Sequence, residues 1–142
     1  MPLPSGVYRL SDASDDRMLS LAGVRPGTGA GTQLVMLTEE EGTAEGFNWR
    51  LQYDPVQNAY SLQHATNGMY VSLEGTAIEN AHLGAHPKPK FFELQPEGEG
   101  FYKISLRGTN FVACTSPCIM YPPMIALLSD VHAGLVWKLK QL

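Results

Sequence analysis

The sequence predicts an all-β protein, specifically a β-trefoil of three pseudo-symmetric four-strand repeats that form a closed barrel with a hairpin cap. Two observations favour strands over helices. No stretch carries apolar residues at helical spacing over three turns, and 14 Gly and 10 Pro divide the chain into short runs. The third observation is that these runs recur in a fixed order. Three units that share one axis can bury their apolar faces together and leave no open sheet edge.

The first repeat covers approximately residues 5–53. Its four β-rich runs lie at 7–10, 18–21, 33–37 and 47–51. The first run contains Tyr-x-Leu, the second an apolar-small-apolar step, and the fourth an aromatic residue followed by x-Leu. Short alternating runs of this kind are typical of half-buried strands. They predict the following core residues and their counterparts in the other repeats: Tyr8, Leu10, Leu19, Leu21, Leu34 and Trp49.

The second and third repeats cover approximately residues 58–96 and 100–142. The second has its runs at 59–62, 70–73, 82–85 and 91–94, and the third at 101–104, 111–114, 124–127 and 136–139. Tyr60 and Tyr102 take the place of Tyr8, and Phe92 and Trp137 take that of Trp49. The third repeat matches only after one deletion near Gly108. A chain of 142 residues fits one domain, so we expect residues 1–142 to form it.

Composition excludes several classes of protein. The net charge is −4 and the ten basic residues are scattered, so we expect no nucleic acid partner. No apolar run approaches the roughly 20 residues of a membrane span. The first residues carry no signal-peptide pattern, which predicts a cytoplasmic location. Cys114 and Cys118 are the only cysteines, and in a reducing compartment we expect both to be free thiols.

The residues at 6–10, 17–23, 31–37 and 49–51 resemble the fungal branch of the ricin-B-type β-trefoil lectins. The resemblance covers essentially the whole chain, and it extends to the lectin-like light subunit of mushroom tyrosinase. It implies binding to glycans or glycoproteins without catalysis. The Asp that the family typically places in the second strand is replaced by Ser20, Ser72 and Ala113. A carboxylate forms the stronger hydrogen bonds to sugar hydroxyls, so the resemblance implies degenerate standard sugar sites.

The resemblance also places the sugar sites between the second-to-third-strand hairpin and the loop after the third strand. Polar groups and a stacking ring are expected there. The second repeat offers the richest set of candidates: Ser72, Glu74, Asn80, His82 and His86. The first repeat offers Ser20, Arg25 and Gln33, and the third offers Tyr121, Asp130 and His132. The alternative is that these are ordinary loop and strand-edge residues.

Three other patterns do not predict a cofactor. His82 and His86 are four residues apart, but on one strand they would lie about 13 Å apart, too far to share a metal. The glycines between 27 and 31 precede a strand rather than a helix, so they indicate a flexible hairpin and not a phosphate loop. The acidic run 39–41 is most simply a solvated loop. We expect neither a metal nor any other cofactor.

Two functions besides sugar binding remain open, and neither is catalytic, because no nucleophile elbow or similar motif is present. The first is a non-sugar-binding accessory or interaction subunit of an enzyme. It would use an exposed apolar patch, with segments 2–4 and 119–124 as candidates. The second is a β-trefoil protease inhibitor with a rigid loop at 23–31 or 115–123.

Overall fold

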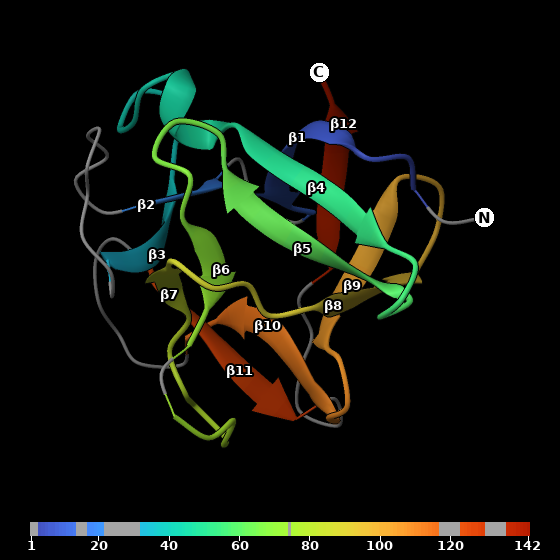
Figure 1. Cartoon of the computed structure of the whole chain (residues 1–142). Coiled ribbons are helices and arrows are strands. Elements are labelled where there is room, and N and C mark those ends of the chain that lie inside the picture. The colour runs from blue at the N-terminus through green and yellow to red at the C-terminus, as the bar shows by residue number, and fades with distance from the viewer. Residues whose placement is uncertain (1–2, 14–16, 22–31, 74, 117–122, 130–135) are drawn as a thin grey trace.

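The computed structural model describes residues 3–13, 17–21, 32–73, 75–116, 123–129 and 136–142 (Figure 1). Within these segments the chain forms twelve β-strands and one short 3-10 helix, and no α-helix. The strands of the first repeat are β1 (Gly6–Asp12), β2 (Met18–Leu21), β3 (Thr32–Leu37) and β4 (Trp49–Asp54), with η1 (Glu45–Phe47) before β4. The second repeat contains β5 (Ala59–His64), β6 (Tyr70–Ser72), β7 (Gly84–His86) and β8 (Phe92–Pro96). The third contains β9 (Phe101–Leu106), β10 (Phe111–Thr115), β11 (Ile125–Ser129) and β12 (Trp137–Gln141).

The first and fourth strands of the repeats pair in a cycle. The antiparallel ladders run from β1 to β4, β5, β8, β9 and β12, and β12 pairs with β1 again. One register recurs at each junction within a repeat, because the tyrosine of the first strand lies opposite the aromatic residue of the fourth. These pairs are Tyr8 with Trp49, Tyr60 with Phe92, and Tyr102 with Trp137. The repetition predicted from the sequence is therefore present in the strand pairing.

The second and third strands of each repeat form the hairpins β2–β3, β6–β7 and β10–β11. The three hairpins meet along their third strands. The Leu34 amide donates to the Leu83 carbonyl, and the Leu83 amide donates to the Ile125 carbonyl. Each of these three side chains is only 1% exposed. One apolar residue from each repeat is therefore buried where the hairpins join.

The core predicted for the first repeat is confirmed, since all six of its residues are at most 3% exposed. The indole N–H groups of Trp49 and Trp137 are polar atoms within this core, and each donates a hydrogen bond. Trp49 Nε1 donates to the Leu19 carbonyl at 3.0 Å, and Trp137 Nε1 donates to the Ala113 carbonyl at 3.0 Å. In both repeats the fourth strand thus reaches the second strand through a buried hydrogen bond, which avoids the cost of burying an unpaired donor. Phe92, in the second repeat, has no such donor.

Tyrosine hydroxyls hold the segment before β1 against the barrel strands. Tyr8 Oη donates to the Pro4 carbonyl at 2.8 Å, and Tyr60 Oη donates to the Leu3 carbonyl at 2.7 Å. Burial raises the pKa of both phenols above the ordinary value near 10. Tyr102 is only half-buried, so the third tyrosine of the repeat differs from the other two.

Two predicted strands begin two residues later than expected. Phe47 lies in η1, where its amide bonds to the Ala44 carbonyl, so β4 begins only at Trp49. In the second repeat the run at 82–85 was placed too early, and β7 begins at Gly84. The reason is that the preceding residues pair with the third repeat. The Leu127 amide donates to the Ala81 carbonyl, and His82 lies opposite Ala126 in an isolated bridge.

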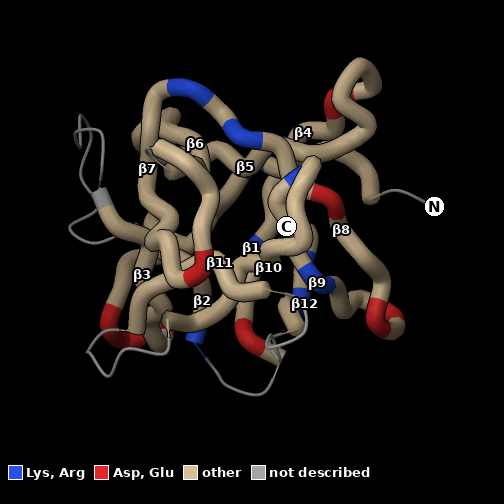
Figure 2. Tube along the Cα trace, turned by 90° about the horizontal axis from the view of Figure 1, so that it is seen from below, with Lys and Arg blue, Asp and Glu red and all other residues tan. Residues whose placement is uncertain are grey.

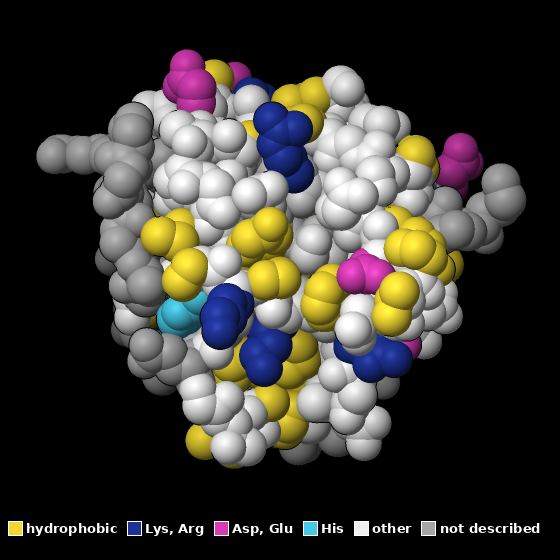
Figure 3. Space-filling model, in the orientation of Figure 1, with side chains coloured by type: hydrophobic (Ala, Val, Ile, Leu, Met, Phe, Trp, Pro, Cys, Tyr) yellow, Lys and Arg dark blue, Asp and Glu magenta, His cyan; other side chains and the backbone are white. Residues whose placement is uncertain are grey.

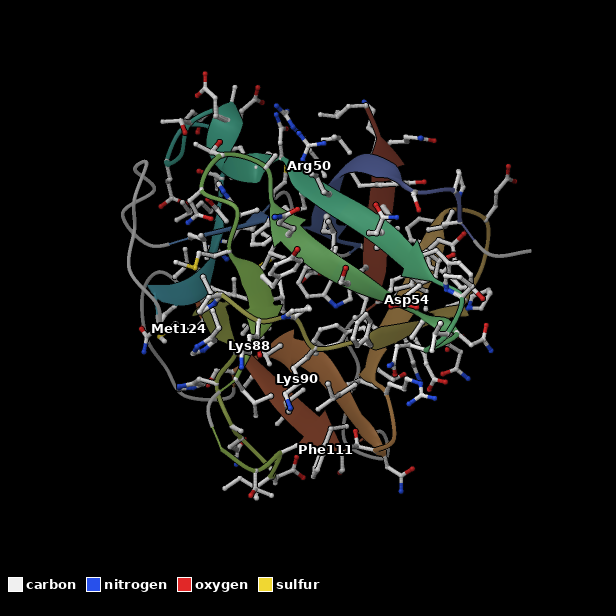
Figure 4. All side chains as sticks on the ribbon, in the orientation of Figure 1. Arg50, Asp54, Lys88, Lys90, Phe111 and Met124 are labelled. Atoms are coloured by element: carbon white, nitrogen blue, oxygen red, sulfur yellow. The ribbon has the colours of Figure 1, made fainter. Side chains whose placement is uncertain are left out.

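Charge is dispersed over the part of the chain that the structure describes. Figure 2 shows Lys and Arg at separate places along the trace, with a pair in the connection between β7 and β8. Figure 4 labels the members of this pair, Lys88 and Lys90. No helix among the described residues is long and apolar enough to cross a membrane.

Candidate functional site

The first repeat buries its candidate position. Ser20 lies on β2 and is 1% exposed, and its hydroxyl donates to the Gly46 carbonyl at 3.0 Å. Ser20 occupies the second-strand position where the resemblance places a sugar-binding Asp, and Gly46 lies just before the fourth strand. Here they bond to each other. A hydroxyl that is buried and already paired offers little to a ligand in solvent.

His64, which belongs to the second repeat, also contacts the Gly46 carbonyl. The sequence did not predict this contact. Its Nε2 lies 3.0 Å from the Gly46 oxygen, and its Nδ1 accepts from the backbone amides of Thr66 and Asn67. These partners require the neutral tautomer with hydrogen on Nε2. The ring is completely buried and packs edge-on against Trp49 with centroids 4.9 Å apart. Desolvation lowers the pKa of His64 below its ordinary value.

Candidates from the first and second repeats meet on either side of β7. Gly84 of β7 pairs with Ser72 of β6 on one side and with Gln33 of β3 on the other. Ser72 is buried, whereas Gln33 is exposed. Two residue pairs along the β6–β7 ladder, half-buried His86 lies opposite Tyr70. The structure therefore brings Gln33 and His86 to neighbouring strands, although the sequence assigned them to different repeats.

Asn80 and His82 lie at the junction between the second and third repeats. The Asn80 backbone has a positive φ of 70°, and its amide donates to the Leu127 carbonyl. His82 Nε2 lies 3.2 Å from the Ser116 hydroxyl. Both side chains are exposed. Ser116 is thus a polar neighbour of the candidate set that the sequence did not indicate, because the contact depends on two hairpins meeting.

Five of the predicted site residues lie outside the described residues. They are Arg25, Glu74, Tyr121, Asp130 and His132. The same holds for Cys118, for the glycine-rich stretch 27–31 and for most of the predicted inhibitor loops. Cys114 is described and lies buried in β10.

Metal ligands do not gather in the described segments, where no group of three or more His, Cys, Asp or Glu side chains could hold an ion. The expectation that His82 and His86 lie on one strand is wrong. The two histidines do not share a strand, because β7 begins after His82. Each has its own neighbour instead, Ser116 for one and Tyr70 for the other.

The conformation of the acidic loop 39–41 is stabilised in part by Glu41, the last residue of the loop. The Glu41 carboxylate accepts from the Thr38 amide at 2.8 Å and from the Thr38 hydroxyl at 3.0 Å. Glu39 and Glu40 are exposed, as expected of a solvated loop. Both line an open hollow of about 530 Å³ that also contains Asp12 and Lys138. This hollow includes none of the predicted sugar-site residues.

Of the comparisons with known proteins, only the one with solved structures finds similar proteins, and the similarity is one of fold. No protein-family model matches the sequence, and no curated protein matches it. Among solved structures, the Rhizoctonia solani agglutinin superimposes with a TM-score of 0.85 at 18% identity, covering 100% of this chain and 99% of its own. The Macrolepiota procera ricin B-like lectin, in complex with lactose, gives 0.79 at 17% identity over 100% of both chains. A designed three-fold symmetric protein, ThreeFoil, gives 0.81 at 18% identity, covering 96% of this chain and 99% of its own.

The likeness to fungal ricin B-like lectins, expected from the sequence, is confirmed at the level of the fold. A third fungal protein, the Polyporus squamosus lectin, gives a TM-score of 0.79 at 12% identity, with 100% of this chain covering 51% of that one. All these identities lie between 12% and 18%. The chain therefore has the all-β, antiparallel architecture of these lectins, while its sites have to be argued from its own residues.

Proposed function

We propose that this protein is a lectin-like carbohydrate-binding protein without catalysis, whose standard sugar sites are degenerate. In this proposal residues 1–142 form one β-trefoil domain with repeats at approximately 5–53, 58–96 and 100–142. The first and fourth strands close a barrel, and the three hairpins cap it. The cycle of ladders from β1 through β12 and back supports the closed barrel. Glycans or glycoproteins are the expected partners, and the expected location is the cytoplasm.

The observation that carries the proposal is the full-length fold likeness to several lectins. Polar side chains that are exposed or half-buried on the hairpins add support. Gln33, Asn80, His82 and His86 provide amide and imidazole groups that suit sugar hydroxyls. A sugar hydroxyl exchanges a bond to water for a bond to protein, and each exchange contributes only about 1 kcal/mol. Weak binding at each site is therefore expected, since no carboxylate stands at the second-strand positions Ser20, Ser72 and Ala113.

An array of immobilised neutral and sialylated glycans tests the proposal directly. We expect reproducible binding to a subset of glycans, competed by the free sugar at millimolar concentration, as weak sites of a few hydrogen bonds imply. Silence of the folded protein on every glycan would reject the proposal. The variant His86→Ala, measured on any positive glycan beside Lys140→Ala as a control distant from the hairpins, then tests the second repeat. Undiminished binding by His86→Ala would place the site away from β7.

The alternatives become relevant if the array is silent. For an interaction subunit, part of the expected apolar patch is already occupied, because Met124 is 9% exposed and lies within the core. The large apolar side chains exposed in the described segments are Val56, Ile78 and Leu142, which belong to three separate regions of the chain. On the face shown in Figure 3, hydrophobic side chains are likewise interspersed with polar ones. Inhibition of trypsin or papain would instead favour the protease-inhibitor alternative.

A further inference from the structure

A pocket of about 320 Å³ opens at the corner where β4 turns into β5 and β8 ends. Its lining includes Tyr53, Asn58 and Tyr60 from β4, β5 and their turn, together with Glu93, Leu94 and Tyr102 from β8 and β9. Figure 1 shows β8 passing beside the β4–β5 turn, and Figure 4 labels Asp54, the last residue of β4, at this corner. The volume lies within the usual range of small-molecule sites, about 300–1,000 Å³.

The pocket exists because one junction between strands is left open. The equivalent junctions of the other repeats pair over three residues between β1 and β4 and over two between β9 and β12. Between β5 and β8 only Tyr60 and Phe92 pair. Beyond that pair β8 continues against β9 alone, as far as Pro96 opposite Tyr102. The gap is thus specific to the second repeat and is not a general feature of the three-fold scaffold.

The rings that line the pocket are held in place by hydrogen bonds. Tyr53 Oη donates to Asn58 Oδ1 at 2.6 Å, and Tyr60 Oη donates to the Leu3 carbonyl at 2.7 Å. The two rings pack edge-to-face with centroids 5.2 Å apart. Asn58 itself is fixed in a turn at a φ of 51°. A ligand would therefore meet the half-buried Tyr53 ring, which is already ordered against the buried Tyr60 ring, and this lowers the entropic cost of binding.

Two polar side chains of the pocket lining, Glu93 and Tyr102, have no partner among the described residues. Glu93 is exposed, and among the described residues no cation lies within salt-bridge distance of its carboxylate. Tyr102 is half-buried, and its hydroxyl has no hydrogen-bond partner within the described segments. Glu93 and Tyr102 thus line the same hollow as Tyr53 and Tyr60, and Glu93 also borders a neighbouring hollow lined by Arg107.

We infer that this pocket binds a neutral pyranose and is a sugar site outside the hairpins, an inference that rests on the proposed lectin function. Recognition of a sugar combines a carboxylate that accepts from two hydroxyls with a ring that packs on the apolar face of the sugar. The second-strand positions of all three repeats have lost the carboxylate, whereas Glu93 supplies one beside Tyr53 and Tyr102. The carboxylate of Glu93 favours an uncharged sugar over an acidic one, because like charges repel at short distance.

Two variants test the pocket with one matched control. Glu93→Gln removes the charge, and Tyr102→Phe removes the free hydroxyl. Glu99→Gln makes the same change of charge at an exposed residue outside the pocket lining. Binding is measured by titration calorimetry with galactose, lactose, N-acetylglucosamine and any neutral glycan positive on the array. We expect Glu93→Gln to weaken the strongest of these by about tenfold or more, as loss of a charged hydrogen bond does.

The outcomes separate the inference from the proposed function. Loss of affinity in Glu93→Gln and Tyr102→Phe, with the Glu99→Gln control unchanged and all three variants equally stable to heat, supports the pocket. Unchanged affinity in both pocket variants overturns the pocket and leaves the lectin function standing. A preference for sialylated over neutral glycans that Glu93→Gln leaves unchanged also overturns it. Absence of any glycan binding by the unmodified protein rejects the lectin function itself, and the pocket inference with it.

Discussion

At the scale of single residues, the Gly46 carbonyl organises the contact between the first two repeats. It lies 3.0 Å from both the Ser20 hydroxyl and His64 Nε2. Both partners are buried, at 1% and 0% exposure. Protonation of His64 would place a second hydrogen on Nδ1, which now accepts from two amides. The fold therefore requires the neutral imidazole, which is the state that the lowered pKa favours.

This requirement predicts a loss of stability in mild acid. Because the pKa of His64 is lower in the folded protein than the ordinary value near 6.5, the unfolded chain binds more protons once the pH falls below about 6.5. The stabilisation is complete above that pH and is lost as the pH falls through the folded pKa, with a slope of at most about 1.4 kcal/mol per pH unit. Urea unfolding at pH 7.5 and 5.5 should show the loss.

Two variants assign the effect to this ring. His64→Gln should reduce the difference in unfolding free energy between the two pH values, although it lowers stability at both. His86→Gln, which leaves His64 in place, should keep the full difference. An identical difference in His64→Gln and the unmodified protein would show that other groups cause the acid sensitivity.

At the scale of elements, the turns explain how diverged repeats keep one register. The third repeat is shortened near Gly108, and there β9 and β10 are joined by a tight turn in which the Thr109 amide donates to the Leu106 carbonyl. Gly108 has a φ of 82°, which side chains other than glycine adopt at a cost. The short turn nevertheless brings Val112 opposite Ser105, and β10 keeps its place in the hairpin cap.

Substitution in this turn should act through backbone conformation alone. A Cβ at Gly108 would meet no atom within 4 Å, so no clash is expected. Gly108→Ala should cost about 1 kcal/mol of unfolding free energy because alanine resists a positive φ. Gly108→Asn should cost less, since asparagine tolerates that region better. Equal losses in the two variants, measured by urea unfolding, would contradict this explanation.

At the scale of the whole molecule, three-fold repetition builds the core while departures from it create the distinctive features. The Tyr–aromatic register is the same in all three repeats, and so is the meeting of the third strands. One departure is the open β5–β8 junction. The other is the segment before β1, which is held by the hydroxyls of Tyr8 and Tyr60. Symmetry thus accounts for stability, and asymmetry provides candidate sites.

Removal of the N-terminal segment tests this view of the two tyrosines. Deletion of residues 1–4 removes the carbonyl acceptors of Tyr8 and Tyr60 and the packing of Leu3. We expect a loss of about 2 kcal/mol in unfolding free energy, from roughly 1 kcal/mol for each hydrogen bond. Deletion of residues 1–2 alone keeps both acceptors and should have little effect. A four-residue deletion as stable as the intact chain would mean that the hydroxyls are equally well satisfied by water.

The sequence by itself determined the number and order of the strands, the core residues and the resemblance to fungal lectins. These depend on local periodicity and on the repetition of Tyr8, Leu19 and Trp49 equivalents, which can be seen without coordinates. Only the tertiary structure decided that the Ser20 hydroxyl is buried and hydrogen-bonded to the Gly46 carbonyl, and that His82 contacts Ser116. It also decided that a tyrosine-lined pocket opens beside Glu93. Each of these contacts joins segments far apart in the chain or depends on where a ladder stops. Such information lies in the packing of repeats against one another, which a local pattern does not encode.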